Sequence, residues 1–280
     1  MSGDRAARNA AVASFYDLMG AFLREVYGEN IHYGYWDEGV ATMSDAQDRL
    51  SDLLTGQLGP LPGRRVIDIG CGTGGLALRV ARQGAEVAGV TLSRWQVDHA
   101  RETAAAAGLA DRARFEVADA AELPFPDDAF DAAVIVEVLV HVEDKARVLR
   151  EVRRVLRPGG QLVFAELVQR HEMDPEQRAA WSAMPMSEVL TLDDYRELLA
   201  AEQFDVREAA DRIDRVRRSF AETRRAVEDR AAALAGRYPP RVLDRLRRGV
   251  LALQDVTEAC LGYAVVSARA IAPAHLPPIR

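Results

Sequence analysis

A glycine-rich stretch, DIGCGTGG at residues 68–75, has the clearest capacity for chemistry in this sequence. Gly70, Gly72 and Gly75 have the spacing G-x-G-x-x-G. Between a strand and a helix, glycines at this spacing let a ligand approach the backbone closely. Asp68 stands two residues before the first of them and adds a carboxylate. The pattern predicts a ligand site where a strand ends, with a tight turn that binds nothing as the alternative.

The residues around this stretch indicate the charge of the ligand. A dinucleotide site also requires an acidic residue about 20 residues further on, at the end of the second strand. That strand ends Val90-Thr91-Leu92, with no acid nearby. Asp68 would repel a pyrophosphate, whereas it would attract an ammonium or sulfonium group. A cationic ligand is therefore favoured, and a dehydrogenase is the weaker hypothesis.

A histidine and a glutamate follow two further strands. His141 ends the expected fourth strand, four residues after Glu137, and Glu166 ends the fifth. Carboxyl ends of neighbouring parallel strands share one edge of a sheet, so both side chains could reach one substrate. A histidine with a pKa of about 6.5 suits a general base, and a carboxylate can orient it or share the task. Alternatively, His141 caps the next helix and Glu166 is a solvated carboxylate.

Alternating strands and helices from residue 64 onward must position these groups, and they predict a parallel sheet covered by helices on both faces. The expected strands are 64–70, 85–92, 112–119, 129–139, 160–168, 204–214 and 261–271. The expected helices are 76–83, 93–108, 143–160 and 192–204. We therefore expect an α/β, Rossmann-like, doubly wound, seven-stranded sheet.

Three segments lie outside this sheet. Residues 1–60 are predicted as helices joined by an aromatic loop, NIHYGYW, residues 168–192 as a methionine-rich loop, and residues 214–258 as two charged helices broken at 238–240. In a doubly wound sheet the ligand lies at the carboxyl ends of the strands, which such segments can cover. We expect one domain over 1–280, with 1–60 as a cofactor lid and 168–192 and 214–258 as substrate lids.

Several motifs together resemble the class I S-adenosylmethionine-dependent methyltransferases, above all those acting on small molecules of bacterial secondary metabolism. DIGCGTGG resembles motif I, EVADA at 116–120 the adenine-binding segment, residues 130–137 the fourth-strand motif, and LRPGG at 156–160 the turn before the fifth strand. The resemblance spans roughly residues 10–270 and implies S-adenosylmethionine as the cofactor, a cation as the charge argument requires.

The resemblance also implies a set of cofactor-binding residues. They are Tyr16, His32, Tyr35, Trp36, Asp68, Gly70, Cys71, Gly72, Thr91, Ser93, Gln96, Asp119, Ala120 and Glu137. Two local alternatives stay open. Ser93 and Gln96 also have the S-x-x-Q spacing of a capping box, and the aromatic residues could be core.

Methyl transfer from a sulfonium is a displacement in which the enzyme positions the donor and acceptor. With His141 and Glu166 as catalytic residues, the leading hypothesis is O-methylation of a small-molecule secondary metabolite, such as a glycosylated or polyketide-type natural product. Related enzymes carry a histidine pair and usually an aspartate, where this chain has Val140-His141 and Glu166. The alternatives are N- or C-methylation, a prenyl diphosphate acceptor bound by arginines of 214–258, or a cyclase that leaves the methyl in place.

Composition limits the remaining classes. A net charge of -7 and a pI near 5.4 argue against nucleic acid, which binds basic domains. No apolar run is long enough to span a membrane, and the N-terminus MSGDRAARNA lacks the apolar core of a signal peptide, so a cytoplasmic protein is expected. Two cysteines and no three-ligand cluster predict no metal site, while a site formed by distant acids such as Glu137 and Glu166 stays open. The expected partner is a small-molecule acceptor, and a homodimer stays open.

Overall fold

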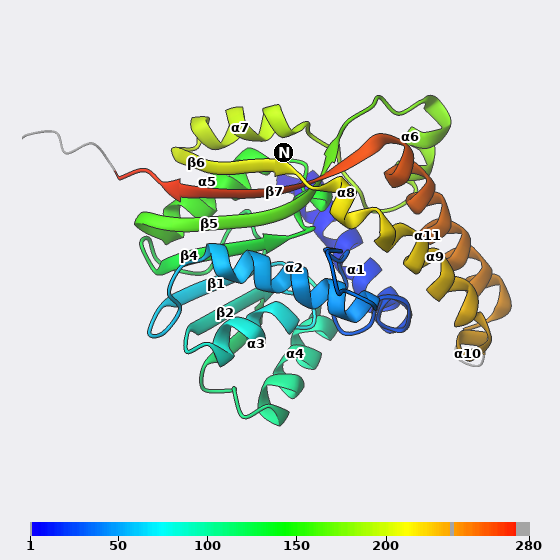
Figure 1. The fold of residues 1–280 in the computed structure, drawn as a ribbon, viewed down its shortest axis with the longest axis horizontal. Coiled ribbons are helices and arrows are strands. Elements are labelled where there is room, and N and C mark those ends of the chain that lie inside the picture. The colour runs from blue at the N-terminus through cyan, green and yellow to red at the C-terminus, as the bar shows by residue number, and fades with distance from the viewer. Residues whose placement is uncertain (1, 236–237, 273–280) are drawn as a thin grey trace, which may run out of the picture.

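The computed structural model describes residues 2–235 and 238–272, whose strands form one seven-stranded sheet between helices (Figure 1). The strands are β1 (Arg65–Ile69), β2 (Glu86–Thr91), β3 (Ala113–Val117), β4 (Phe130–Val136), β5 (Leu156–Gln169), β6 (Phe204–Asp211) and β7 (Leu261–Ala270). Their order across the sheet is β3-β2-β1-β4-β5-β7-β6. The strand order reverses between β1 and β4, which confirms the predicted doubly wound α/β sheet.

The seventh strand departs from the expected parallel arrangement. β7 lies between β5 and β6 and runs antiparallel to both. The chain leaves β6 at the carboxyl edge of the sheet, forms helices above that edge, and re-enters where Leu261 pairs with Gln169, the last residue of β5. Because it returns from the edge it left, β7 can only run in the opposite direction.

Twelve helical segments occur in the described residues. They are α1 (Ser2–Tyr27), α2 (Met43–Gln57), α3 (Gly75–Arg82), α4 (Arg94–Ala106), the 3-10 turn η1 (Leu139–His141), α5 (Lys145–Val155), α6 (Pro175–Ser182), α7 (Leu192–Ala201), α8 (Ile213–Val216), α9 (Arg218–Asp229), α10 (Ala231–Ala235) and α11 (Pro240–Cys260). Side-chain caps fix several starts. Thr42, Asp174 and Thr191 form capping boxes at α2, α6 and α7.

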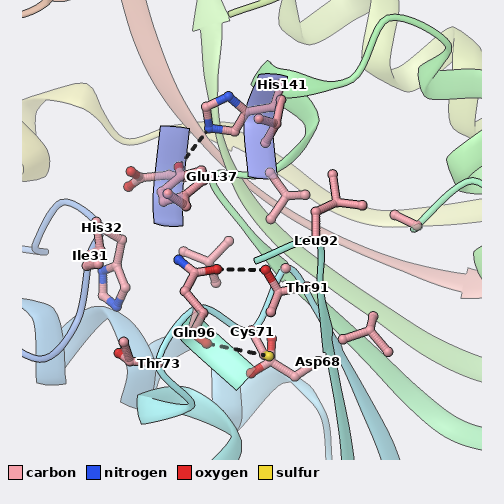
Figure 2. Close-up of a pocket in the computed structure, with 18 of the residues that line it drawn as sticks. Ile31, His32, Asp68, Cys71, Thr73, Thr91, Leu92, Gln96, Glu137 and His141 are labelled. Carbon is pink, nitrogen blue, oxygen red and sulfur yellow. Dashed lines mark hydrogen bonds between the residues drawn. The ribbon is translucent and has the colours of Figure 1, made fainter. Parts of the chain in front are cut away.

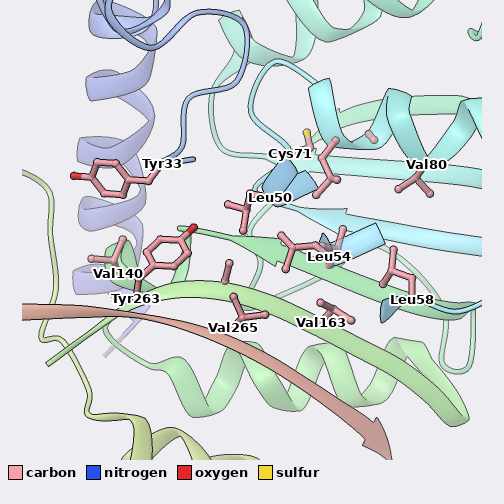
Figure 3. Packing of buried hydrophobic residues seen from close by; sticks show 14 of the residues in the cluster. Tyr33, Leu50, Leu54, Leu58, Cys71, Val80, Val140, Val163, Tyr263 and Val265 are labelled. Atoms are coloured by element: carbon pink, nitrogen blue, oxygen red, sulfur yellow. The ribbon is translucent and has the colours of Figure 1, made fainter. Parts of the chain in front are cut away.

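Alternating residues of each strand build a core on either face of the sheet. In β5, Val163 and Ala165 pack toward α2, α3 and α4, while Leu162 and Phe164 pack toward α5 and α7. Figure 3 shows the first core, where Leu50 and Leu54 of α2 lie over the sheet. A slip of one residue in the pairing of a strand would move its core side chains to the opposite face, so this packing helps to set the register.

The segments predicted to lie outside the sheet form a third cluster. Side chains of α1, α9, α10 and α11 pack on one another, with Phe22, Val227 and Leu234 almost fully buried. In Figure 1 these helices lie beyond the carboxyl edge of the sheet. They stand over the place where a doubly wound sheet binds its ligand.

Three boundaries differ from the predictions. Residues 168–192 contain the short helix α6 and the end of β5, because Asp174 and Pro175 supply a helix start inside the predicted loop. Residues 214–258 form most of α8 to α11 rather than two helices. α5 ends at Val155 and β5 begins at Leu156, since Pro158 and Gly159, with a φ of 76°, favour extended backbone and a turn.

Candidate active site

A cavity opens at the carboxyl ends of β1, β2 and β4 (Figure 2). It measures about 1060 Å³, including its open mouth. Twelve cofactor or catalytic residues predicted from the sequence line it: Tyr16, His32, Asp68, Gly70, Cys71, Gly72, Thr91, Gln96, Asp119, Ala120, Glu137 and His141. Four others, Tyr35, Trp36, Ser93 and Glu166, are not among its lining residues. The sheet edge therefore gathers most of the predicted site, although its parts are far apart in the sequence.

The glycine loop is shaped by two different requirements. Gly70 has a φ of 72°, and a Cβ on it would lie 2.1 Å from Cγ2 of Val138, so the turn itself excludes a side chain. Gly72 also has a positive φ, of 52°, but a Cβ there would approach nothing closer than Nε2 of Gln96, at 4.0 Å. Gly72 thus keeps the floor of the cavity open.

Asp68 is a buried carboxylate with an unsatisfied oxygen. Its residue is 3% exposed, and no hydrogen-bond partner for Oδ2 occurs in the part of the chain that the structure describes. Burial raises the pKa of this carboxyl group to about 7. A buried polar atom without a partner is costly in a folded protein. Because Asp68 lines the cavity, a cationic ligand there would satisfy it.

The polar residues that follow β2 have two different roles: Thr91 lines the cavity, whereas Ser93 caps α4. Thr91 Oγ1 donates to Gln96 Oε1 at 2.7 Å, and both residues line the cavity. Ser93 caps α4, because its Oγ accepts from Gln96 N at 3.1 Å and donates to Asp17 at 2.5 Å. In a full capping box the Gln96 side chain would also accept from Ser93 N. Here Gln96 Oε1 accepts from Thr91 Oγ1 instead. Ser93 therefore supports the helix rather than lining the cavity.

Asp119 is held by the N-terminal helix. Its Oδ2 accepts from Asn9 Nδ2 at 2.7 Å and lies 3.6 Å from Arg5 Nε, while its Oδ1 accepts from Ala121 N at 2.8 Å. Asn9 is itself a lining residue that the sequence did not reveal. α1 therefore reaches across the cavity to the loop after β3.

His141 has partners at both ring nitrogens. Nδ1 lies 2.8 Å from Pro185 O, and Nε2 lies 2.9 Å from Tyr16 Oη. A carbonyl oxygen only accepts, so Nδ1 carries the proton of the neutral ring and Nε2 accepts from Tyr16. Burial lowers the pKa of His141 to about 4, which keeps the ring neutral at pH 7. The lone pair that can take up a proton is therefore on Nε2.

The predicted setting of His141 needs correction. β4 ends at Val136, and His141 lies in η1 rather than at the strand end. The residue that caps α5 is Asp144, whose side chain accepts from Arg147 N at 2.9 Å. The helix-cap alternative for His141 is thus wrong, because a closer acidic residue takes that position.

Glu137 occupies a strained position at the floor of the cavity. Its φ of 53° is unusual for a residue with a side chain. Both Tyr33 N and Tyr263 Oη donate to Oε1, each at 2.9 Å. Burial raises the pKa of Glu137 to about 8, so the group is largely protonated at neutral pH. It is thus a half-buried, largely neutral carboxyl group in the lining of the cavity.

Glu166 lies beneath the cavity instead of in it. Its side chain is fully buried, with Oε2 accepting from Val140 N at 3.1 Å and Oε1 from Leu167 N at 2.8 Å. Burial raises its pKa to about 7. The solvated-carboxylate alternative is therefore wrong. Glu166 supports the backbone next to His141.

The aromatic loop is only partly in the cavity. His32 lines it, with Nδ1 2.7 Å from Tyr33 O. Trp36 is buried elsewhere, where its Nε1 donates to Ser219 Oγ at 2.8 Å and the Arg218 guanidinium lies 4.0 Å from its ring centre. Tyr35 packs against the core that covers one face of the sheet. For Tyr35 and Trp36 the structure favours the core alternative.

The segments predicted as substrate lids, 168–192 and 214–258, also contribute more to packing than to the cavity. Trp181 is buried, and Met173 and Met186 pack against the core. Arginines of 214–258 pair with neighbouring acids, as Arg224 does with Asp255 at 2.7 Å and Arg248 with Asp244 at 2.7 Å. The described residues that line the cavity include four acidic residues, Glu29, Asp68, Asp119 and Glu137, but no lysine or arginine.

Comparison with known proteins decides the family. A model described as a methyltransferase domain matches residues 67–164. The (+)-O-methylkolavelool synthase of Herpetosiphon aurantiacus is 31% identical over 262 residues, covering 92% of this chain and 93% of that protein. The chain belongs to the class I S-adenosylmethionine-dependent methyltransferases.

Two further relatives show the range within this methyltransferase family. The 27-O-demethylrifamycin SV methyltransferase of Amycolatopsis mediterranei is 44% identical over 154 residues, which cover 55% of this chain and 57% of that protein. The crystal structure of the [4+2]-cyclase SpnF is 34% identical, has a TM-score of 0.81, and matches over 94% of this chain and 96% of that one. The family's fold therefore supports more than one kind of reaction.

The cavity of this methyltransferase fits the family's cofactor. The unsatisfied Oδ2 of Asp68 suits a cationic group, and the open space above Gly72 suits a ligand packed against backbone. Within the described ranges, no three His, Cys, Asp or Glu side chains come together as metal ligands would. No helix among residues 2–235 and 238–272 is both long and apolar enough to cross a membrane.

Proposed function

We propose that this methyltransferase transfers the methyl group of S-adenosylmethionine to a hydroxyl oxygen of an uncharged natural product. The observation that carries the proposal is the neutral imidazole of His141, whose Nε2 lone pair faces a cavity with no lysine or arginine in its described lining. The names of two relatives, (+)-O-methylkolavelool synthase and 27-O-demethylrifamycin SV methyltransferase, support it.

The cofactor end of the site is assigned to the residues that surround Asp68. S-adenosylmethionine, when bound, supplies a methyl group on a sulfonium that needs no further activation. In this proposal Asp68 binds the cationic part of the cofactor, Thr91 and Gln96 serve its ribose, and Asp119 serves its adenine. Tyr16 and His32 cover the methionine end of the cofactor, so residues 1–60 act as the cofactor lid.

The acceptor's proton is assigned to His141. A hydroxyl that displaces Tyr16 Oη from Nε2 would place its own proton on the same lone pair. The low pKa of the buried ring keeps Nε2 unprotonated at neutral pH, although it also makes the ring a weak base. Proton transfer is therefore expected to accompany methyl transfer rather than precede it.

The electrostatics of the cavity distinguish among acceptors. A prenyl diphosphate would enter a cavity whose described lining holds no lysine or arginine to compensate for its charge. We therefore place the diphosphate alternative below an uncharged alcohol. The second candidate is a cyclase that leaves the methyl group on the cofactor, because SpnF is similar over nearly the whole chain.

A methyl-transfer assay tests the proposal. The protein is incubated with S-adenosylmethionine and a panel of polyketide, terpenoid and glycoside alcohols that includes kolavelool and 27-O-demethylrifamycin SV, with geranyl diphosphate as the charged comparison. Formation of S-adenosylhomocysteine with a product heavier by one CH₂ unit supports O-methylation. Methylation of geranyl diphosphate, or rearrangement of an acceptor without S-adenosylhomocysteine, would contradict it.

Cofactor affinity is expected to depend on pH through Asp68. The pKa of the free carboxyl group is raised to about 7, and a bound cation favours its ionised form. Binding must then release a proton below pH 7, and the affinity falls by about tenfold for each pH unit below that value. Calorimetry in buffers of different ionisation enthalpy measures the released proton. The effect should vanish in Asp68→Asn, and its persistence there would assign the proton to another group.

A further inference from the structure

The only lysine of the chain is buried beside the loop that carries His141. Among 36 lysine and arginine residues, Lys145 alone is lysine. It is 5% exposed, and Nζ donates to Val142 O at 2.7 Å, Ser187 Oγ at 2.9 Å and Glu188 O at 2.8 Å. An ammonium group has three N–H donors, so these contacts use all of them. A planar guanidinium could not reproduce this arrangement.

The contacts of Lys145 join the loop that carries His141 to the segment that follows α6. Residues 183–188, which we call the strap, follow α6 and include Ser187. Ser187 N donates to Val140 O at 2.7 Å, and its Oγ lies 2.9 Å from Val140 O and 2.8 Å from Val142 O. Trp181 Nε1 donates to Ser187 O at 2.7 Å from the other side. The strap is therefore tied to the backbone on both sides of His141.

The strap also carries the oxygen that determines the tautomer of His141. Pro185 O is the acceptor 2.8 Å from Nδ1. A neutral imidazole can carry its proton on either nitrogen, and the hydrogen bond at one nitrogen decides which. If the strap moved away, the proton could pass to Nε2, the nitrogen that faces Tyr16 and the cavity. The ring would then have no free lone pair for the acceptor's proton.

We propose that Lys145 and Ser187 are positioning residues that hold the strap, and with it Pro185 O, against His141. Neither side chain is among the cavity-lining residues, so both act through the histidine. They keep the proton on Nδ1 and the lone pair on Nε2. The expected effect on catalysis rests on the proposed O-methyltransferase function. The expected tautomer of His141 is independent of that function.

The test uses the whole protein without cofactor or acceptor, labelled with ¹⁵N in its histidines. The variants are Lys145→Met and Ser187→Ala, with Ser182→Ala as the matched control, because Ser182 is an exposed serine at the end of α6. His141→Gln assigns the signal of His141 among the five histidines. The wild type and the control should show Nδ1 protonated and Nε2 unprotonated at neutral pH. In Lys145→Met and Ser187→Ala the ¹⁵N chemical shifts of both ring nitrogens of His141 should move toward the values of a mixture of tautomers.

Activity provides the second measurement. Loss of the fixed tautomer, together with the loosened position of the His141 ring, should lower kcat by about tenfold or more, while KM for S-adenosylmethionine stays within about twofold, because the cofactor residues are untouched. Ser187→Thr, which keeps the hydroxyl, should recover both the tautomer and kcat. A general packing defect would not be rescued in this way.

Two results would overturn the proposal. One is an unchanged His141 tautomer in the variants; if Lys145→Met does not fold, Ser187→Ala alone decides. The other is a shifted tautomer with unchanged kcat, which would remove the role in catalysis. The resonance measurement needs no acceptor, so it keeps its meaning even if the proposed methyl transfer proves wrong.

Discussion

An Asp68→Asn variant is expected to fold and to bind S-adenosylmethionine about 30- to 4000-fold more weakly than the wild type, which corresponds to a loss of about 2–5 kcal/mol. The substitution keeps the size of the side chain and removes its charge. Since Oδ2 has no hydrogen-bond partner among the described residues, the lost charge has no second function to obscure the result. Titration calorimetry at pH 8, where Asp68 is largely ionised, measures the change in affinity.

The stability of the same variant separates binding from folding. The raised pKa of Asp68 means that the folded state binds more protons than the unfolded state between about pH 4 and pH 7. The wild type without cofactor therefore loses stability as pH rises through that range, and Asp68→Asn does not. At pH 8 the variant should have the higher Tm and the lower affinity. Asp98→Asn, the same change at an exposed position of α4, should alter neither, and a lower Tm for Asp68→Asn would contradict this account.

A His141→Ala variant is expected to lower kcat by about 10²- to 10⁴-fold, the usual contribution of a positioned general base. The Kd for S-adenosylmethionine should change only a few-fold, because Asp68, Thr91 and Asp119 remain in place. Steady-state kinetics and calorimetry on the same preparation measure the two quantities. An unchanged kcat would reject the base role while leaving the cofactor assignment intact.

Glu166→Gln provides the comparison for His141→Ala. Each carboxylate oxygen of Glu166 accepts from one backbone N–H, and an amide keeps only one such acceptor. The loop around Val140 should loosen, and kcat should fall less than in His141→Ala. If the two variants lost the same amount of kcat, Glu166 would have to act on the acceptor more directly than its burial allows.

The residues predicted around the glycine loop do line the cavity, because that part of it is local: Gly70, Gly72 and Asp68 lie within one strand-turn-helix. Asp119 and Glu137 each follow a strand and were located by the resemblance to family motifs. The parallel topology then brought these turns to one edge. Strand boundaries were less certain, and His141 proved to lie in a 3-10 turn, since its position depends on Pro185 and Glu166 more than on local pattern.

The cover of the site was much harder to predict. Asn9 reaches Asp119 from 110 residues away, and no periodicity in α1 marks it as a ligand residue. In the aromatic loop His32 faces the cavity while Trp36 turns toward α9, a difference decided by the partner Ser219. The strap was hidden in a segment predicted as a loop. Contacts between distant, individually unremarkable residues leave no signal in a single sequence. Cytoplasmic location and oligomeric state stay predictions.

The middle of helix α1 contacts the residues around the cavity at three places. Asn9 binds Asp119, Tyr16 binds His141, and Asp17 accepts from Ser93 at 2.5 Å. One helix carries these three contacts, so a movement of α1 that released a spent cofactor would break all of them together. In the proposed mechanism the acceptor hydroxyl replaces Tyr16 at His141, so cofactor release and access of the acceptor to His141 would both depend on the motion of this helix.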